Sequence, residues 1–406
     1  MPKKPRIITV TSGTLSSRPP CAARPAGLAT AIAFARAGHA VEVFEKHPGL
    51  ATLGAGVLIQ PQGVAALHDL GVGPAFEAAS VPIARLVGLS ERGWKLVDIP
   101  YADLEARAVS RSALGGVLLR ECERLGVLMR FGCGVDAVHT HGGAASIVSD
   151  GQERACDIVV IANGANSTLP AACGLAVQAA PYRWGALWSL IDLDDWPDPH
   201  ILGQRYGGTA RMFGIMPTER IGGRLRVSFF WSLRRDRYDA WLAAPIADFR
   251  RELLALWPES VPVVERIHSH AQFAFAAYCH ARPRRLAAGP VCIVGDAAHA
   301  MSPQLGLGST LAVQDALALA AHVGQAGPAE GLRRYSAARL STVRAYQALS
   351  RALTPCFQAD GKGLWRDLLF AGALRVPGTR WLMHRSIAAP RRCVRGAWSV
   401  DPAGQA

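Results

Sequence analysis

A short apolar strand followed by a glycine-rich turn and a long helix is the feature that most restricts the fold of this chain. Residues 291–294 are apolar, Gly295-Asp296 follows at once, and Gly306 and Gly308 precede a long apolar helical stretch. Gly295 relieves crowding at the strand exit, Asp296 can accept a hydrogen bond from a sugar-like hydroxyl, and the two later glycines expose backbone amides at a helix start. The segment therefore predicts a ligand site at the end of a strand.

The N-terminal region predicts a β-α-β unit. Residues 6–10 and 40–44 are apolar enough for buried strands, and residues 27–37 have the spacing of a helix between them. Glu45 ends the second strand, where a carboxylate can accept hydrogen bonds from the ribose hydroxyls of an adenine dinucleotide. Gly27 opens the helix, whose N-terminus would face the pyrophosphate.

Two other segments contain candidate ligand contacts. Gly54 and Gly56 stand near the start of the run Leu53–Gly71 and permit close approach of the backbone to a ligand. Arg111 stands at the head of an apolar helical stripe that Gly115-Gly116 would weaken. From the residues alone, a flexible loop and a solvated arginine remain the alternatives.

Alternating segments predict further β-structure. Residues 134–138 and 145–148, separated by His141-Gly142-Gly143, predict a β-meander, and residues 157–161 predict a strand that returns to the main sheet. Helices predominate from Gly331 onward. Strands of a second, mostly antiparallel layer are predicted at 184–191, 210–216, 224–231 and 268–276.

Composition bounds the class of protein. The chain has 406 residues, 50% of them hydrophobic and 18% charged, which suits one large or two closely joined globular domains. The longest apolar stretches are interrupted by polar residues, and the basic N-terminus lacks the apolar run of a secretory signal, so we expect a cytoplasmic protein without a transmembrane helix. Nine cysteines without a C-x-x-C pair indicate reduced thiols.

Charge and histidine placement narrow the partners. The net charge of +13 is spread along the chain, which favours a solvated basic surface and no nucleic-acid partner. The segment 364–392 mixes large apolar residues with arginines and is compatible with contact with a membrane surface, although packing against the body is favoured. The pairs His139/His141 and His268/His270 have no cysteine or carboxylate at ligand spacing, so no metal site is predicted.

The segment from Gly295 to Thr310 resembles that of the class A flavoprotein monooxygenases, the group of para-hydroxybenzoate and salicylate hydroxylases. The order of elements is similar over nearly the whole chain. In that family a G-D-A-A-H-x-x-x-P-x-x-G-x-G segment holds the ribityl chain of FAD through its aspartate and lies against the flavin through its proline and glycines. The resemblance assigns these contacts to Asp296, Pro303, Gly306 and Gly308.

The same resemblance implies other contacts with FAD. Glu45 and Arg111 match contact residues of the family, and Val135 matches the valine whose backbone meets the adenine. His299 is expected to be structural, and no protein nucleophile is required, because the cofactor carries the difficult step. The rest of the predicted cofactor site consists of Gly27, Gly54 and Gly56.

The resemblance also implies the fold class and the domains. The fold class is α/β, a Rossmann-like FAD-binding domain with a β-meander, a second mostly antiparallel substrate sheet, and C-terminal helices. The discontinuous FAD-binding domain would comprise residues 1–75, 100–175 and 281–330. The substrate-binding sheet domain would comprise residues 76–99 and 176–280, and the C-terminal helical region residues 331–406.

Two segments depart from the family pattern. Where the family has G-x-G-x-x-G straight after the first strand, Thr11 to Cys21 are inserted, and the first two glycine positions fall on Ala22 and Arg24. The family's D-G-x-x-S-x-x-R segment begins here with Asn163 and ends with Pro170, so its acid and its arginine are both missing. The second departure weakens the expectation of pyridine-nucleotide use, because proline cannot replace a cation.

The resemblance implies an FAD-dependent monooxygenase that uses NAD(P)H and molecular oxygen to hydroxylate a small organic substrate, with an apolar or aromatic molecule as the family-level expectation. One alternative is another FAD-dependent oxidoreductase of the same fold, such as a reductase. A halogenase is disfavoured because the W-x-W-x-I-P motif is absent. A flavin-free, non-catalytic remnant is the other alternative, because the glycine turn is disrupted.

Overall fold

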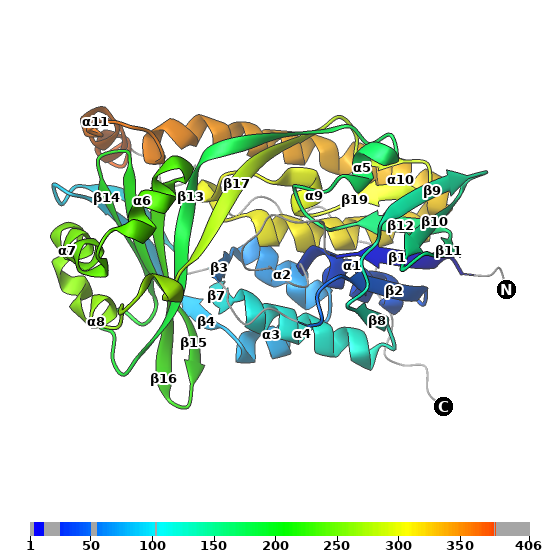
Figure 1. The fold of residues 1–406 in the computed structure, drawn as a ribbon, viewed down its shortest axis with the longest axis horizontal. Helices are drawn as coiled ribbons and strands as arrows, with labels where there is room; N and C mark the ends of the chain where they lie inside the picture. Colours follow the sequence, from blue (N-terminus) through cyan, green and yellow to red (C-terminus); the bar gives the residue numbers. More distant parts are fainter. Residues whose placement is uncertain (1–3, 12–24, 50–54, 102–103, 377, 379–406) are drawn as a thin grey trace.

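The computed structural model describes residues 4–11, 25–49, 55–101, 104–376 and 378. A six-stranded sheet with the order β18-β19-β12-β1-β2-β8 lies in one half of the molecule (Figure 1), and only the pair β18–β19 is antiparallel. Its inner strands are mostly apolar between their ends, with Thr9 and Glu42 as exceptions, as expected for a parallel sheet covered on both faces. The bounds are β1 (Arg6–Val10), β2 (Ala40–Glu45), β8 (Leu128–Phe131), β12 (Ile158–Ile161), β18 (Ala287–Ala288) and β19 (Val291–Ile293).

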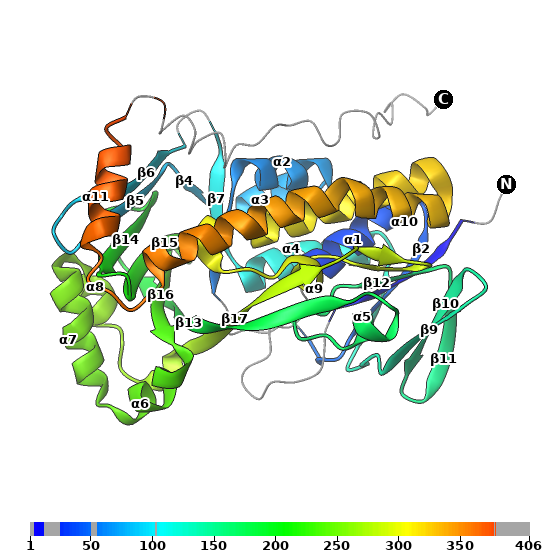
Figure 2. The same ribbon diagram turned by 90° about the horizontal axis from the view of Figure 1, so that it is seen from above.

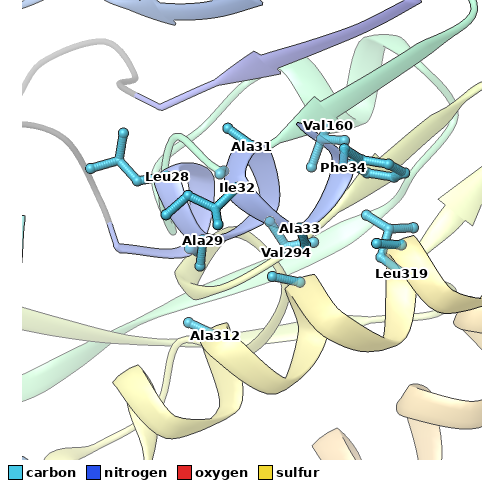
Figure 3. Close-up of a cluster of buried hydrophobic side chains, with 14 of the residues drawn as sticks. Leu28, Ala29, Ala31, Ile32, Ala33, Phe34, Val160, Val294, Ala312 and Leu319 are labelled. Atoms are coloured by element: carbon cyan, nitrogen blue, oxygen red, sulfur yellow. The ribbon is translucent and has the colours of Figure 1, made fainter. Parts of the chain in front are cut away.

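Helix α1 (Pro25–Arg36) is the centre of this half. Its residues from Ala26 to Phe34 are all buried, so the helix has no solvent-facing stripe over this length. Figure 3 shows α1, with Ala29, Ala33 and Phe34 labelled, alongside Ala312 and Leu319 of helix α10 (Gly308–Phe357). The many alanines of α1 let the neighbouring backbones approach closely, which explains how one helix can be covered on every side.

Helix α10 (Gly308–Phe357) begins at the predicted position and extends over both halves of the molecule (Figure 2). It is interrupted at Gly327, where φ is 76°, because Pro328 cannot continue the hydrogen-bond pattern of the preceding turn. The other helices of six or more residues are α2 (Pro61–Asp69), α3 (Gly73–Ala78), α4 (Arg111–Arg124), α6 (Tyr238–Ala243), α7 (Ile246–Leu256) and α11 (Leu364–Ala373). The shortest α-helices are α5 (Leu169–Ala172), α8 (Val261–Val264) and α9 (Asp296–His299).

A seven-stranded sheet with the order β17-β13-β16-β15-β14-β5-β6 forms the other half, and only the pair β14–β5 is parallel. The predicted second, mostly antiparallel layer is therefore confirmed. The strand predicted at 268–276 is wrong at its start, because Ser269 and Gln272 cap a 3₁₀ turn there. The bounds are β5 (Arg85–Ser90), β6 (Lys95–Pro100), β13 (Val177–Leu193), β14 (Ile201–Gly207), β15 (Arg211–Ile221), β16 (Arg224–Arg234) and β17 (Ala274–Pro283).

Two small sheets complete the fold. The predicted meander is present, with the order β11-β10-β9. The strand predicted at 134–138 is wrong only at its start, because strand structure begins at Ala137. Its two hairpins have positive φ at both central residues, 54° and 88° at Gly142-Gly143 and 51° and 70° at Asp150-Gly151, as in type I′ turns. The bounds are β9 (Ala137–His141), β10 (Ala144–Ser149) and β11 (Gln152–Cys156), and, in the other small sheet, β3 (Gly56–Ile59), β4 (Val81–Ile83) and β7 (Ala106–Ser110).

The two faces of the seven-stranded sheet are packed differently. One face packs against α6, α7 and α8 through an aromatic cluster that includes Phe213, Phe229 and Trp257. The other face packs against the end of α10, where Tyr206 meets Phe357 with ring centroids 5.3 Å apart. Each half of the molecule therefore has its own core, and α10 joins them.

Helix α11 has an exposed apolar surface. The exposed fractions of Trp365, Leu368 and Leu369 all exceed 50%. The part of the predicted membrane-contact segment from 379 to 392 lies outside the described residues. No helix in the described part of the chain is long and apolar enough to cross a membrane.

Candidate functional site

The turn after β19 has the geometry that its glycine predicts. Gly295 has φ 60° and ψ −143°, and a Cβ added there would lie 2.5 Å from the Cβ of Ala26 in α1. Only glycine fits, because both the backbone angle and the approach of α1 exclude a side chain. The chain then turns into α9 with Asp296 exposed at its first position.

A buried ionic network holds this turn in place. His299 Nε2 lies 2.8 Å from Asp315 Oδ2, and Arg339 Nε donates a 2.7 Å hydrogen bond to Asp315 Oδ1. Burial raises the pKa of the Asp315 carboxyl, but Arg339 and His299 outweigh it and hold that pKa below its usual value. The carboxylate is therefore charged and joins α9 to both parts of α10. His299 belongs to the sequence motif, whereas Asp315 and Arg339 are isolated charges in helical stretches outside it.

The segment between α9 and α10 leads to an open helix start. Pro303 begins a 3₁₀ turn, and Gly306 ends it in the left-handed region with φ 61°. Gly308 is the first residue of α10 and is exposed, and a Cβ added there would meet no atom within 4 Å. The first amides of a long helix lack partners within the helix and form its positive end, so this position suits a negatively charged or electron-rich ligand.

Glu45 is buried at the end of β2, beside the end of β1. Its Oε2 accepts a 2.8 Å hydrogen bond from Thr11 Oγ1, and its Oε1 accepts a 2.9 Å bond from the backbone amide of His47. Cys133 donates its backbone N–H to the Glu45 carbonyl at 3.0 Å, which brings the loop containing Val135 next to Glu45.

Gly27 allows close packing of α1 on the end of β1. A Cβ added at Gly27 would lie 2.2 Å from Thr11 Cγ2. This is the role of the third glycine of a dinucleotide-binding turn, where helix and strand pack closely. Residues 12–24, with Ala22 and Arg24, lie outside the described residues, and so does Gly54.

Two other predicted contacts have clear local surroundings. Gly56 donates its N–H to Ser228 Oγ at 2.9 Å, and a Cβ there would lie 2.6 Å from Ser228 Cβ. Packing against the seven-stranded sheet therefore accounts for this glycine without a ligand. Arg111 is exposed at the first position of α4, and Ser110 Oγ caps that helix by accepting from the Ala113 amide at 3.0 Å.

Three aromatic residues of the seven-stranded sheet contact one another through a hydrogen bond and a ring contact. The sequence alone did not indicate this cluster. Trp188 Nε1 donates a 3.1 Å hydrogen bond to Tyr278 Oη, and the Trp188 ring lies 5.1 Å from that of Phe230. Burial raises the pKa of Tyr278 to about 12, although Trp188 and the charge of Arg111 oppose the shift. The Tyr278 hydroxyl therefore stays protonated at neutral pH and lies within electrostatic range of Arg111.

The carboxyl ends of the parallel strands gather these groups. Thr11 follows β1, Glu45 ends β2, Asn163 closely follows β12, and Gly295 closely follows β19. Asn163 is 4% exposed, and its Oδ1 has no hydrogen-bond partner among the described residues. A buried acceptor of this kind suits a bound polar molecule. Ligands of open parallel sheets bind at this edge, so the described residues fit an extended dinucleotide.

Comparison with known proteins supports this assignment. A family model described as FAD binding domain matches residues 23–350. The chain is 28% identical over 364 residues to the FAD-dependent urate hydroxylase of Klebsiella pneumoniae, covering 83% of this chain and 89% of that protein. It is 27% identical over 349 residues to the salicylate hydroxylase of Pseudomonas putida, covering 73% and 75% of the two chains.

Solved structures share the fold. A variant of Klebsiella pneumoniae HpxO complexed with FAD matches with a TM-score of 0.77 and 22% identity, over 94% of this chain and 98% of that chain. The tetrameric form of 2-methyl-3-hydroxypyridine-5-carboxylic acid oxygenase matches with a TM-score of 0.75 and 18% identity, over 91% and 96%. The predicted α/β fold is therefore confirmed over nearly the whole chain.

Proposed function

The chain belongs to the class A family of FAD-dependent monooxygenases, and from this premise we propose that it hydroxylates a small, largely apolar aromatic or heterocyclic molecule, with NAD(P)H as electron donor. FAD is the cofactor of the family, and when bound it supplies the oxygen-activating chemistry. The relatives named above include hydroxylases of urate and of salicylate, both small ring compounds. The chain's own residues would bind, orient and shield the reactants.

The observation that carries this proposal is the position of Glu45, Asn163 and Asp296 at the carboxyl ends of strands in the parallel sheet. Asp296 would accept from a ribityl hydroxyl, and Glu45 from the ribose of the adenosine part, with the backbone of Val135 near the adenine. Pro303, Gly306 and Gly308 would lie along the ring, where the positive end of α10 stabilises negative charge on a reduced ring. Gly27 would support the pyrophosphate turn through helix packing.

The substrate class is inferred from the seven-stranded sheet. Trp188 is only partly buried and packs on the buried Phe230, so its ring would be the one to contact a substrate ring by offset or edge-to-face packing. The Tyr278 hydroxyl can donate to a polar substituent, because its raised pKa keeps its proton in place. The expected domain boundaries are part of this proposal, with residues 76–99 and 176–280 as the substrate-binding part.

The electron donor is inferred from the chemistry of the family. Pro170 is buried in the short helix α5, so no cation for a nucleotide phosphate comes from this position. NAD(P)H use therefore rests on the family chemistry.

The cysteines in the described part of the chain are all free thiols, which supports a cytoplasmic location.

The first experiment separates an enzyme from a flavin-free remnant. The purified chain is titrated with FAD, and its visible spectrum and flavin fluorescence are recorded. We expect a bound flavin, substrate-stimulated oxidation of NAD(P)H, uptake of oxygen and a hydroxylated product. A colourless protein that leaves FAD free in solution would refute the proposal, and turnover that continues without oxygen would favour a reductase.

A matched pair of glycine substitutions tests the position of the ring. Gly308 and Gly324 both lie in α10, and neither has an atom within 4 Å of an added Cβ. We expect Gly308→Ala to weaken FAD binding about tenfold or more, because its methyl group would enter the space of the ring, whereas Gly324→Ala leaves affinity unchanged. Both variants should fold normally, since alanine favours a helix. Equal FAD affinities in the two variants would place the ring elsewhere.

A further inference from the structure

The β-meander brings together three side chains that the proposed oxygenation does not use. His139 and His141 alternate along β9 and therefore share one face of the sheet. Glu153 comes from β11, on the far side of the central strand β10. One ligand atom from each residue lies within 4.8 Å of the other two, and all three residues are exposed.

The distances between these groups suit a common metal ion. His139 Nδ1 lies 3.4 Å from Glu153 Oε1. Two ligands bound tetrahedrally to zinc at bond lengths of about 2.0–2.2 Å are themselves about 3.4 Å apart, so this pair already has the required separation. The His139 and His141 rings have centroids 6.3 Å apart and planes at 67°, and one nitrogen of each ring lies within 4.8 Å of the other.

The surroundings hold the carboxylate and the strands in place. Ser146 on β10 donates from its Oγ to Glu153 Oε1, and Ser146 is the direct partner of His139 in the sheet register. Two tight type I′ hairpins fix the relative positions of the strands. Such partners of a ligand orient it for metal binding.

We propose that His139, His141 and Glu153 form a surface site for a divalent first-row transition-metal ion of the zinc type. Two imidazole nitrogens and one carboxylate suit zinc, cobalt, nickel or copper, whereas calcium and magnesium require more oxygen ligands. Three protein ligands leave at least one coordination position open to water or another molecule. The site is confined to the meander and is independent of flavin binding.

The histidine pair was visible in the sequence, but its carboxylate was not. Ligand spacing along the chain predicted no metal site, because Glu153 follows a complete hairpin and strand after His141. Only the antiparallel order β11-β10-β9 brings the carboxylate over the central strand to the two histidines.

The test is a Zn²⁺ titration of the full chain loaded with FAD, followed by calorimetry and by metal analysis after dialysis. The variants are His139→Ala, His141→Ala and Glu153→Gln. The control is His268→Ala, which removes an exposed histidine from another part of the molecule. We expect each of the three variants to lose one bound equivalent or to weaken its affinity about tenfold or more, as losses around metal ligands commonly do. The control should bind like the parent chain.

Other outcomes would overturn the site. The parent chain and the variants contain the same cysteine thiols, which can also bind zinc. The test therefore compares the Zn²⁺ bound by each variant with that bound by the parent chain. The site does not exist if His139→Ala and Glu153→Gln both bind as much Zn²⁺ as the parent chain, with the same affinity. It is equally refuted if His268→Ala removes the same equivalent. Flavin absorbance and near-ultraviolet circular dichroism verify that every variant is folded, and neither signal depends on metal.

Discussion

The buried carboxylate of Asp315 connects α9 with the two parts of α10. It is fully buried, and its two carboxylate oxygens contact Arg339 and His299. A buried ion pair contributes little net stability compared with apolar packing, but loss of one partner leaves the other charge uncompensated. The network therefore matters more for the fixed geometry of the Gly295 turn than for the total stability of the fold.

We predict that Asp315→Asn destabilises the protein by about 3–5 kcal/mol, because Arg339 would remain buried without its counter-charge. The measurement is urea unfolding at neutral pH, together with FAD affinity, which should also fall as the turn loosens. The matched control is Glu330→Gln, which removes exposed helical ion pairs with Arg333 and Arg334 and should leave stability nearly unchanged, because water screens exposed charges.

Acid pH provides a second measurement on the same variant. The pKa of Asp315 is lowered in the folded protein, so its contribution to stability is complete above the ordinary pKa of an aspartate and is lost as the pH falls through the lowered value. The difference in unfolding free energy between the parent chain and Asp315→Asn should therefore narrow as the solution is acidified. A difference that stays constant down to strongly acid pH would mean that the carboxylate charge is not the cause.

At the scale of elements, the contact between β1 and α1 determines where the first helix can lie. Thr11 has two functions in this contact. Its Oγ1 donates to Glu45, and its Cγ2 occupies the space in which a side chain at Gly27 would have to fit. The helix, the strand and the ribose-binding candidate Glu45 are therefore coupled through one threonine.

We predict that Gly27→Ala costs about 1–3 kcal/mol through overpacking and weakens FAD binding, because α1 would have to move away from β1. Adding Thr11→Ser should recover most of the loss, since serine retains the hydroxyl but lacks the interfering methyl group. Thermal unfolding and flavin titration of the single and double variants measure both effects.

Gly116→Ala is the control for the loss of a glycine. It lies in α4, where the added Cβ would make only an ordinary 3.4 Å contact with the end of Arg120. It should be neutral or stabilise the protein by about 0.5–1 kcal/mol, because alanine favours a helix. If the double variant is no more stable than Gly27→Ala alone, the contact with Thr11 is not the obstacle.

At the scale of the whole molecule, helix α11 is joined to the seven-stranded sheet by buried charges. Arg366 is fully buried, donates to the Cys356 carbonyl at 3.1 Å, and lies 5.3 Å from the ring centroid of Tyr206. Asp367 accepts from Arg366 and from Arg92, the latter at 2.9 Å. Helix α11 is thus fixed to the half that contains the seven-stranded sheet, whereas the start of α10 belongs to the half that contains the six-stranded sheet.

We predict that Asp367→Asn lowers the free energy of opening α11 by about 3–5 kcal/mol, because Arg366 would remain buried without its partner. Hydrogen exchange should accelerate within residues 364–373, while FAD affinity stays unchanged, since the proposed contacts Glu45, Asp296 and Gly308 lie in the half that contains the six-stranded sheet. Lys362→Ala, at an exposed neighbouring position, should change neither measurement. Loss of FAD binding in Asp367→Asn would show that the two halves are coupled more tightly than their separate cores suggest.

The sequence by itself determined the local features of this protein. Gly295, Gly306 and Gly308 predicted the end of β19, the turn that follows it and the start of α10, because steric limits on the backbone act within a few residues. Apolar periodicity likewise located α1, β2 and the buried Glu45 at its end. The resemblance to the flavin hydroxylases depended on these same local signals, and the comparisons confirmed it.

The tertiary structure alone decided the contacts between distant segments. Asp315 meets Arg339 only because the second part of α10 folds back on the first part after the break at Gly327. Glu153 meets His139 only through the register of three strands. The same holds for Gly56, whose neighbour Ser228 lies on a strand far along the chain. Such pairings depend on topology and strand order, for which the spacing of residues along the chain contains no direct signal.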